Sequence, residues 1–454
     1  MDAASNWTRT LERAWHPAFA WVERTLGGTV ARYERRARWR PAFDLDVARD
    51  DGSVLAVHFR GERNPGQAVY GLRPEYEILR VLEQQGLPVP RIHGFCEAPA
   101  GILMSRMPGR PNLATVTDRT ERERILDEFI DELVRLHGLD PDLFRAAGID
   151  VPAGNYSLAW DDFAYWLQIY RALKTHPEPA IELVMAWMHR QAPKPSGEIV
   201  FLQGDAGQFI FDGGHLTSLL DFEVGHLGDP AHDLAALYIR DTSEPLGDVD
   251  RAVKRYCARS GRRFSQELLS FLMLQFCMTT PMPVGPMLRR TWPLQEPMQY
   301  LSWHQCYMRL SLEIVARQSG IELVRPDLPE PAETLASGGH RALHALLATG
   351  LGVAENAQTY PFQVASRLAH YLERAGAYGP AIEAEDLRDC KQLLGRTFSS
   401  WRQAEAALEA LALDRGRTEP ELLVVLHRHH WRQEFIAAPL MNELRGATLQ
   451  FPNP

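Results

Sequence analysis

The feature that most constrains the fold of this chain is a short strand followed by a tight hairpin, both set among helical segments. Residues 201–237 read FLQGDAGQFIFDGGHLTSLLDFEVGHLGDPAHDLAAL. The β-type runs cover 199–202, 209–211 and 216–220, and the turn Asp212-Gly213-Gly214 joins the last two. Apolar residues at helical spacing flank this stretch on both sides, so an α+β fold is expected.

This hairpin places three oxygen-bearing side chains. Asp205 lies in the glycine-flanked loop after the first strand, Gln208 precedes the hairpin and Asp221 follows it. Because the two ends of an antiparallel hairpin lie side by side, we expect these side chains to converge. Two carboxylates and an amide oxygen suit Mg²⁺ bound to a substrate phosphate. Phosphoryl transfer uses such a set, with one carboxylate orienting and deprotonating an alcohol.

The chain as a whole is expected to form three regions. A β-rich N-terminal lobe spans 1–107, a helical lobe that contains the hairpin spans 108–335, and an all-helical extension spans 336–454. The apolar stripes of the extension need a partner surface, so we expect it to border the acceptor site or to form a homodimer interface. Strands of the N-terminal lobe are expected at 29–35, 42–48, 54–60 and 101–107.

The hairpin stretch also carries an ordered set of motifs. Gly204-Asp205 is followed by Asp221-Phe222-Glu223, and then by Gly228-Asp229-Pro230 with Asp233-Leu234-Ala235. This set resembles the aminoglycoside phosphotransferase and choline-kinase-like superfamily, and a weaker resemblance extends from about residue 27 to residue 320. The resemblance implies a bilobal protein-kinase-like fold. It also implies an ATP-dependent kinase that transfers phosphate to a hydroxyl group of a small molecule.

The resemblance implies roles for individual residues. Asp205 would be the catalytic base, Asp221 the main ligand of Mg²⁺, and Asp233 a structural support of the loop. The usual Asn of the family is missing, and we expect the amide oxygen of Gln208 to bind the metal in its place. The usual His before Gly-Asp is Gln203 here. If these two departures abolish turnover, the chain is instead a pseudokinase-like nucleotide-binding regulatory protein.

The resemblance further places an ATP site in the N-terminal lobe. Glu75, on a helix expected over 75–85, would pair with a basic residue on the third strand. No lysine occurs before Lys174, so we assign this position to Arg60, whose planar fork suits both carboxylate and phosphate. The backbone of Met104 and Arg106 would face the adenine.

The glycine-rich phosphate loop of such kinases is absent. A run of arginines stands in its place: Arg32, Arg35, Arg36, Arg38 and Arg40. These side chains either bind phosphates above the cleft or form a solvated strand face.

The expected acceptor site is aromatic and apolar, and the same side chains fit packing in a helical core equally well. Acceptors within the family include antibiotics, choline and hydroxyacyl-CoA thioesters. A cationic acceptor needs acidic groups or an aromatic cage, whereas this region is rich in apolar side chains with arginines nearby, so we expect an apolar alcohol or a hydroxyacyl compound. The side chains concerned are Trp160, Tyr165, Trp166, Tyr170, Met273, Met278, Met282, Met287, Trp292, Arg289 and Arg290.

Composition argues against several other classes of protein. The net charge of −9 disfavours a nucleic-acid partner. The first 12 residues do not resemble a signal peptide, and no apolar run approaches the roughly 20 residues of a membrane span, so no membrane partner is expected. The five cysteines are scattered without a CxxC pair, which favours a cytoplasmic location. His427, His429 and His430 crowd one helix, where packing is a better explanation than a metal.

Overall fold

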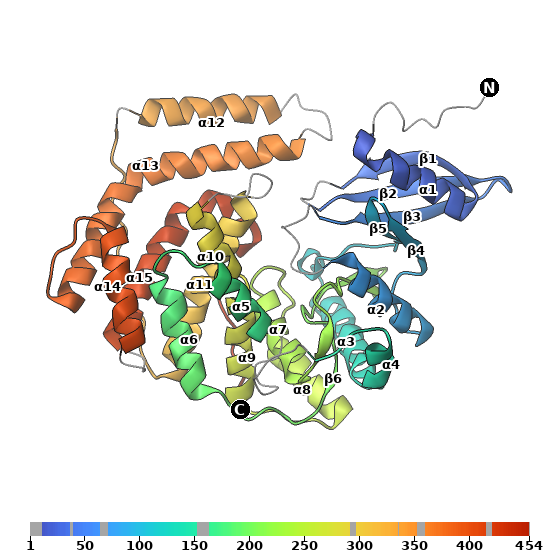
Figure 1. The fold of residues 1–454 in the computed structure, drawn as a ribbon, viewed down its shortest axis with the longest axis horizontal. Helices are drawn as coiled ribbons and strands as arrows, with labels where there is room; N and C mark the ends of the chain where they lie inside the picture. Colours follow the sequence, from blue (N-terminus) through green and yellow to red (C-terminus); the bar gives the residue numbers. More distant parts are fainter. Residues whose placement is uncertain are drawn as a thin grey trace. The chain divides into compact units, whose positions relative to one another are not determined.

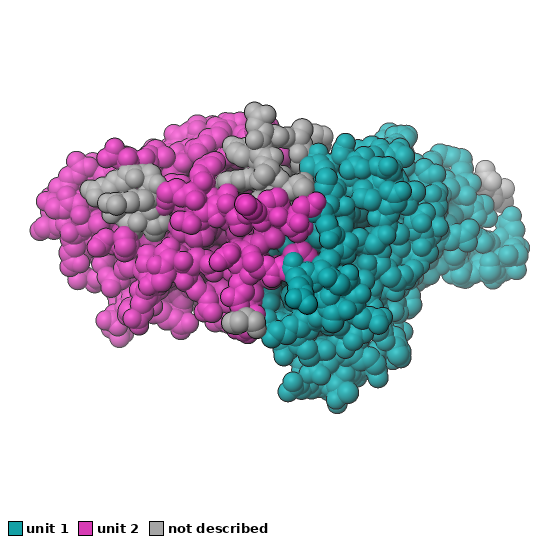
Figure 2. Space-filling view, turned by 90° about the horizontal axis from the view of Figure 1, so that it is seen from below, with its two compact units in different colours: residues 1–151, 198–240, 244–263 teal, residues 152–197, 241–243, 264–454 magenta. Residues whose placement is uncertain are grey.

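The computed structural model divides the chain into two compact units. Unit 1 comprises 1–151, 198–240 and 244–263, and unit 2 comprises 152–197, 241–243 and 264–454 (Figure 2). The bounds of these units differ from those of the three expected regions. The boundary at 107 lies inside unit 1, and the helical extension shares unit 2 with the helices that precede it. The structure describes residues 11–36, 40–63, 71–151, 163–290, 297–334, 336–351, 359–414 and 420–453.

Unit 1 begins with a five-stranded antiparallel sheet in the order β1-β2-β3-β5-β4 (Figure 1). The strands expected from the sequence are confirmed, and β4 is an addition. Gly94 interrupts the alternation of β4, and the pairing with β5 shifts register between Ile92 and Gly94, which hides this strand from pattern analysis. The strands are β1 (Gly28–Arg35), β2 (Ala42–Arg49), β3 (Val54–Gly61), β4 (Ile92–Glu97) and β5 (Ala100–Ser105).

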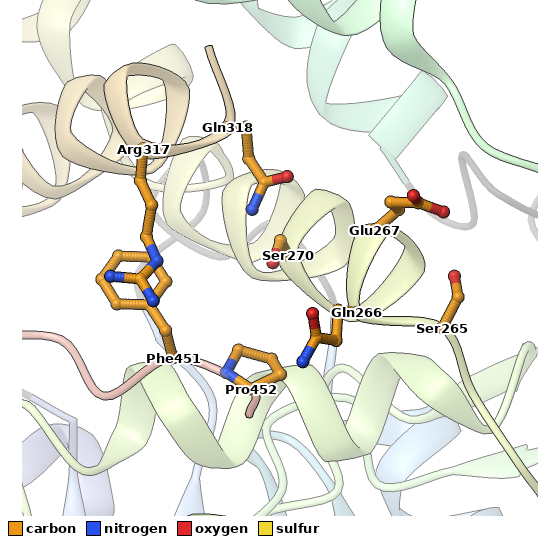
Figure 3. Close-up of a pocket in the computed structure, with 8 residues that line it drawn as sticks. All are labelled: Ser265, Gln266, Glu267, Ser270, Arg317, Gln318, Phe451 and Pro452. Carbon is orange, nitrogen blue, oxygen red and sulfur yellow. The ribbon is translucent and has the colours of Figure 1, made fainter. Parts of the chain in front are cut away.

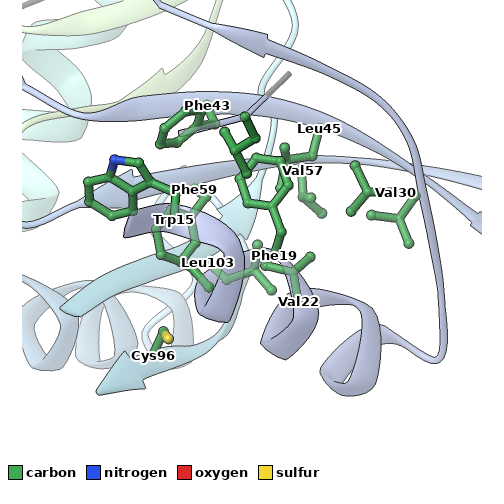
Figure 4. Close-up of a cluster of buried hydrophobic side chains, with 13 residues drawn as sticks. Trp15, Phe19, Val22, Val30, Phe43, Leu45, Val57, Phe59, Cys96 and Leu103 are labelled. Carbon is green, nitrogen blue, oxygen red and sulfur yellow. The ribbon is translucent and has the colours of Figure 1, made fainter. Parts of the chain in front are cut away.

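The two faces of this sheet differ in chemistry. One face packs against α1 (His16–Leu26), where Phe19 and Val22 meet Phe43 and Phe59 from β2 and β3 (Figure 4). Because side chains alternate along a strand, the opposite face of β2 and β3 carries polar residues. These are Asp44, Asp46, His58 and Arg60.

The rest of unit 1 supports the embedded hairpin. Strand β6 (Val200–Leu202) pairs with β9 (His226–Gly228), and β7 (Phe209–Asp212) pairs with β8 (His215–Leu219). The two short sheets thus bring the ends of the 201–228 segment together. The helices of this unit are α2 (Leu72–Gln84), α3 (Arg119–Leu136), α4 (Pro141–Ala146), α7 (Ala231–Arg240) and α8 (Val249–Ser260).

Among the described residues, the regular secondary structure of unit 2 is helical. Its longest helix, α13, continues through Pro380, and α12 and α15 pack along it. Gly395, at a φ of +68°, follows the end of that helix. The helices are α5 (Phe163–Leu173), α6 (Pro179–Gln191), α9 (Gln266–Met278), α10 (Pro281–Arg290), α11 (Pro297–Gln318), α12 (Ser337–Leu351), α13 (Thr359–Leu394), α14 (Trp401–Asp414) and α15 (Pro420–Ile436).

One segment of unit 2 is long and apolar enough to cross a membrane by length and composition. It is the 25-residue stretch Gln266–Arg290, made of α9 and α10. The apolar window in it is 78% buried inside the structure, as in the core helix of a soluble protein. The expectation that no apolar run comes near this length was therefore too strict.

Candidate active site

A buried aspartate on α7 holds the loop of Asp205 in place. The Asp233 carboxylate accepts hydrogen bonds from the backbone amides of Gln203 (2.8 Å) and Gly204 (2.9 Å). His137 Nε2 lies 3.1 Å from the same carboxylate, and its Nδ1 lies 2.6 Å from the hydroxyl of Tyr256. Asp233 is fully buried, so the loop is tied to the helix by charge-assisted bonds that water does not weaken.

Gln203 joins the two ends of the hairpin. Its side-chain Nε2 donates to the carbonyl oxygens of Gln208 (2.9 Å) and Leu220 (2.7 Å), which belong to opposite ends. Leu220 N also donates to Gln208 O at 3.0 Å. The residue that departs from the family motif therefore has a defined structural contact. It fixes Gln208 beside the residue that precedes Asp221.

Asp205, the expected catalytic base, has polar partners among the described residues at only one of its two carboxylate oxygens. Gln208 Nε2 donates to Asp205 Oδ2 at 2.8 Å, and Arg240 forms an ion pair with the same oxygen. Oδ1 is buried and has no hydrogen-bond partner within the described part of the chain. Burial raises the pKa of Asp205 above its ordinary value, and Arg240 partly offsets this shift. A carboxylate with one free, desolvated oxygen is suited to accept a proton.

Arg240 is a site residue that sequence reasoning missed. It lies in the last turn of α7, seven residues after Asp233. Residues seven apart lie on the same face of a helix, so the face that supports the loop also delivers the cation to Asp205. This spacing is the signal that could have identified it.

Arg60 lies between Glu75 and Asp221. The pair with Glu75 is the one expected from the sequence, and the contact with Asp221 is an addition. Its Nε is 3.0 Å from Glu75 Oε2, and its Nη2 is 2.5 Å from Asp221 Oδ1. Burial raises the pKa of Glu75 to about 7, against the opposing effect of Arg60. For Asp221, burial acts in the same direction, but Arg60 and Arg40 outweigh it and hold its pKa well below the ordinary value.

A second acid, Glu223, gathers two further arginines. Arg63 Nη2 lies 2.8 Å from Glu223 Oε1, and Arg40 forms an ion pair with Oε2. Arg40 is buried and lies 3.9 Å from Glu75. Within the expected arginine run, Arg40 is thus the member placed at the site. Arg32 is exposed, Arg35 pairs with Glu12, Arg36 pairs with Asp44, and Arg38 lies outside the described residues.

The two residues expected to meet adenine lie within or just after β5. Met104 is paired with His58 on β3, and the amide of Arg106 donates to Ala56 O at 3.1 Å. The amide of Ser105 donates to Arg91 O at 2.9 Å. These donors are engaged inside the sheet, so a base at this position would use carbonyl groups or the residues after Arg106.

The donor set is compatible with Mg²⁺ on a nucleotide phosphate. Asp221 and Gln208, at the two ends of the hairpin, offer a carboxylate and an amide oxygen. Among the described residues, no group of three or more His, Cys, Asp or Glu side chains is placed to hold a metal. An ion here would therefore need phosphate oxygens in addition to the protein ligands, as Mg²⁺ in nucleotide sites does.

The side chains expected to line the acceptor site are mainly part of the helical core. Tyr170 is fully buried and donates to Glu182 Oε1 at 2.7 Å, and Arg289 forms an ion pair with the buried Glu405. Trp166, Met273, Met278 and Met282 are also buried, whereas Trp160 and Trp292 lie outside the described residues. The inference of an apolar wall from these residues is therefore wrong for the buried members.

A cavity of about 340 Å³ lies elsewhere in unit 2, and none of the expected site residues lines it. Figure 3 shows Arg317 beside the ring of Phe451, with the guanidinium carbon 4.3 Å from the ring centroid.

The histidines of α15 are engaged in packing contacts. His429 Nδ1 lies 2.7 Å from Asp386 Oδ2, and its ring stacks on Trp401 at 3.7 Å between centroids. His427 faces Glu313, and His430 faces Gln305.

Residues 47–268 match the phosphotransferase enzyme family. This segment is a phosphotransferase-family domain. It contains the residues expected in the catalytic, metal and ATP sites, including Asp205 and Asp221. The phosphotransferase fold extends beyond the matched segment. A putative aminoglycoside phosphotransferase from Ralstonia eutropha covers 67% of this chain and 97% of its own, with a TM-score of 0.52 and 18% identity. The expected kinase-like α+β fold is thereby confirmed.

Two curated relatives are much longer than this chain. Acyl-CoA dehydrogenase family member 10 from Mus musculus is 26% identical over 181 residues, which are 37% of this chain and 16% of the relative. Acyl-CoA dehydrogenase family member 11 from Homo sapiens is 23% identical over 233 residues, which are 47% of this chain and 28% of the relative. The chain thus spans less than a third of the length of either relative.

Proposed function

We propose that this protein is a small-molecule kinase that transfers the γ-phosphate of ATP to a hydroxyl group. The observation that carries the proposal is the position of Asp221 at the end of the hairpin, against Arg60 and beside the loop of Asp205. One oxygen of Asp205 is free for a substrate hydroxyl, and a cation is in place for phosphate. Such a site acts by positioning and by electrostatic stabilisation of the transferred group.

Asp205 would take the proton of the acceptor hydroxyl on Oδ1, its unpartnered oxygen. Its raised pKa makes it a stronger base than an ordinary aspartate. The contacts of Gln208 and Arg240 with Oδ2 hold the carboxylate in one orientation, and among the described residues Oδ1 has no hydrogen-bond partner. Rotation of the carboxylate would break both contacts.

Arg60 would bind the nucleotide phosphates while Glu75 holds its guanidinium from behind. Glu75 is buried and contacts Nε, and Nη2 contacts Asp221. Asp221 and Gln208 would hold Mg²⁺. When bound, this ion offsets negative charge on the phosphoryl group. The low pKa of Asp221 keeps the carboxylate ionised and ready for a cation at neutral pH.

For the acceptor, we propose a hydroxyacyl compound or a related apolar alcohol. The names of the curated relatives point to acyl thioester metabolism, and this is the support for that class. The test is ADP release from ATP and Mg²⁺ in the presence of two panels, hydroxylated acyl compounds and aminoglycosides. Turnover with the acyl panel is expected. Turnover confined to aminoglycosides would contradict the acceptor class but not the kinase.

A nucleotide-binding protein without turnover is the competing function. The contacts of Gln208 and Arg240 with Oδ2 of Asp205 favour this alternative, because they occupy one oxygen of the proposed base. Mg²⁺-dependent ATP binding with no ADP release for any acceptor would support this alternative. ADP release above the acceptor-free rate would exclude it.

A further inference from the structure

The polar face of the N-terminal sheet carries a histidine held by a buried aspartate. His58 Nδ1 lies 2.6 Å from Asp44 Oδ1, and the two residues are direct cross-strand neighbours on β3 and β2. Asp44 is buried, and its other oxygen accepts a bond from Arg36 at 2.9 Å. Burial acts to raise the pKa of Asp44, but His58, Arg36 and Arg106 together outweigh it, and the pKa lies below the ordinary value. The carboxylate is therefore ionised and can only accept hydrogen bonds.

This contact determines which ring nitrogen is left for a ligand. Because ionised Asp44 can only accept, Nδ1 of His58 must carry the proton. In the neutral ring, Nε2 is then a hydrogen-bond acceptor. Nε2 has no partner among the residues that the structure describes, and the His58 side chain is 25% exposed.

His58 lies on the same sheet face as the phosphate-binding candidate. His58 and Arg60 are two residues apart on β3, so their side chains point the same way and are separated by about 7 Å along the strand. Two residues before His58 on β3 lies Ala56. Its carbonyl oxygen accepts a hydrogen bond from the amide of Arg106, just after β5. A nucleotide with its phosphates at Arg60 would extend its nucleoside along this line.

We propose that His58, oriented by Asp44, is the residue that selects the nucleotide base. Its Nε2 accepts a hydrogen bond from the 6-amino group of adenine, which a base with a 6-oxo group does not offer. Two further ion pairs, Arg36 with Asp44 and Arg106 with Asp46 (2.7 Å), make this sheet face polar. Base choice on such a surface depends on hydrogen bonding more than on apolar contact. This inference rests on the proposed kinase function.

The test compares ATP with inosine triphosphate, which differs at the 6-position. Affinities are measured calorimetrically with Mg²⁺ at pH 8.5, where an ordinary imidazole is neutral. Wild-type protein is expected to prefer ATP by about three- to tenfold, the effect of one hydrogen bond. His58→Ala should abolish this preference and leave the affinity for inorganic tripolyphosphate unchanged. His58→Phe keeps a ring of similar size without the acceptor and should behave in the same way.

The matched control is His93→Ala. His93 lies on β4 of the same sheet, and its Nε2 contacts Ser105 Oγ at 3.0 Å. Ser105 pairs with Val57, whose side chain lies on the sheet face opposite to His58. His93 therefore contacts that opposite face, and His93→Ala should keep the wild-type preference for ATP. Equal affinities in the wild type, or a preference that survives in both His58 variants, would overturn the inference alone. Failure to bind any nucleotide would contradict the proposed function itself.

Discussion

Arg240 forms an ion pair with Asp205, and both are held by one helix, α7. Asp233, on the same face of that helix, accepts the two amides that begin the Asp205 loop. The helix therefore sets both the position of the proposed base and its electrostatic environment. If α7 shifts, the loop and the cation shift together.

Removal of this cation should change the pH dependence of activity. Arg240 lowers the pKa of Asp205, so Arg240→Ala should raise it further and move the acidic limb of the kcat/KM profile to higher pH. A shift of about one pH unit corresponds to roughly 1.4 kcal/mol, or tenfold in rate below that limb. Arg259→Ala, an exposed arginine of α8 paired with Asp131, is the control. An unchanged limb in Arg240→Ala would show that the ion pair does not act on the base.

The buried Glu75 should make stability depend on pH. Its pKa is raised from an ordinary 4.5 to about 7, so between these values the native state binds more protons than the unfolded state. The free energy of unfolding should therefore fall as pH rises from 4.5 to 7, by up to about 3 kcal/mol, and level off above 7. Glu75→Gln should remove this part of the slope in chemical denaturation. Glu97→Gln, at an exposed pair with Arg73, should retain it.

The increase in ATP affinity that Mg²⁺ gives should depend more on Asp221 than on Gln208. Asp221→Asn replaces the charged ligand and should abolish the increase in ATP affinity that Mg²⁺ gives to the wild type. Gln208→Ala should reduce that increase and leave metal-free binding nearly unchanged. Asp212→Asn, in the exposed turn of the same hairpin, is the control. Full Mg²⁺ enhancement in Asp221→Asn, measured by calorimetry, would remove Asp221 from the metal site.

The C-terminal helices should be required for the stability of unit 2. Arg309 on α11 is almost fully buried, and its partners are Glu434 (2.5 Å) on α15 and the carbonyl of Ala447 (2.8 Å). Glu434→Ala leaves a buried cation with one charged partner fewer, and should lower the free energy of unfolding by roughly 3 kcal/mol. Thermal denaturation checks this against Glu443→Ala, at an exposed position. Equal melting temperatures for the two variants would contradict the importance of this contact.

Local sequence patterns predicted the hairpin that Asp205 and Asp221 flank, because the geometry of a short hairpin is set by nearby residues. Asp205, Gln208 and Asp221 are close in sequence. Strand pairing and the Gln203 side chain hold the two ends of the hairpin together, and the Gln208 side chain contacts Asp205. Arg60 and Glu75 were placed by resemblance, and the structure brings them within 3.0 Å. Arg40 and Arg63 were harder to identify, since their ion pairs with Glu223 join segments about 160 to 180 residues apart.

Burial was the main property that the sequence did not reveal. The methionines of α9 and α10 and the aromatic residues of α5 fit a substrate wall and a helical core equally well as a pattern. Packing against neighbouring helices decides between them, and it buries Met273, Met278 and Tyr170. The sequence patterns also did not show the division into units, because unit 1 is discontinuous: the chain leaves it after residue 151 and returns to it at residue 198.

The central claim is that Asp205 is the base of a phosphotransferase, and one comparison tests it most directly. ADP release is measured for the wild type and Asp205→Asn with the same acceptors, alongside the affinity of each protein for ATP with Mg²⁺. We expect the variant to bind ATP within a few-fold of the wild type and to lose turnover by at least about 100-fold. Near-normal ADP release by Asp205→Asn, with ATP affinity intact, would contradict the claim.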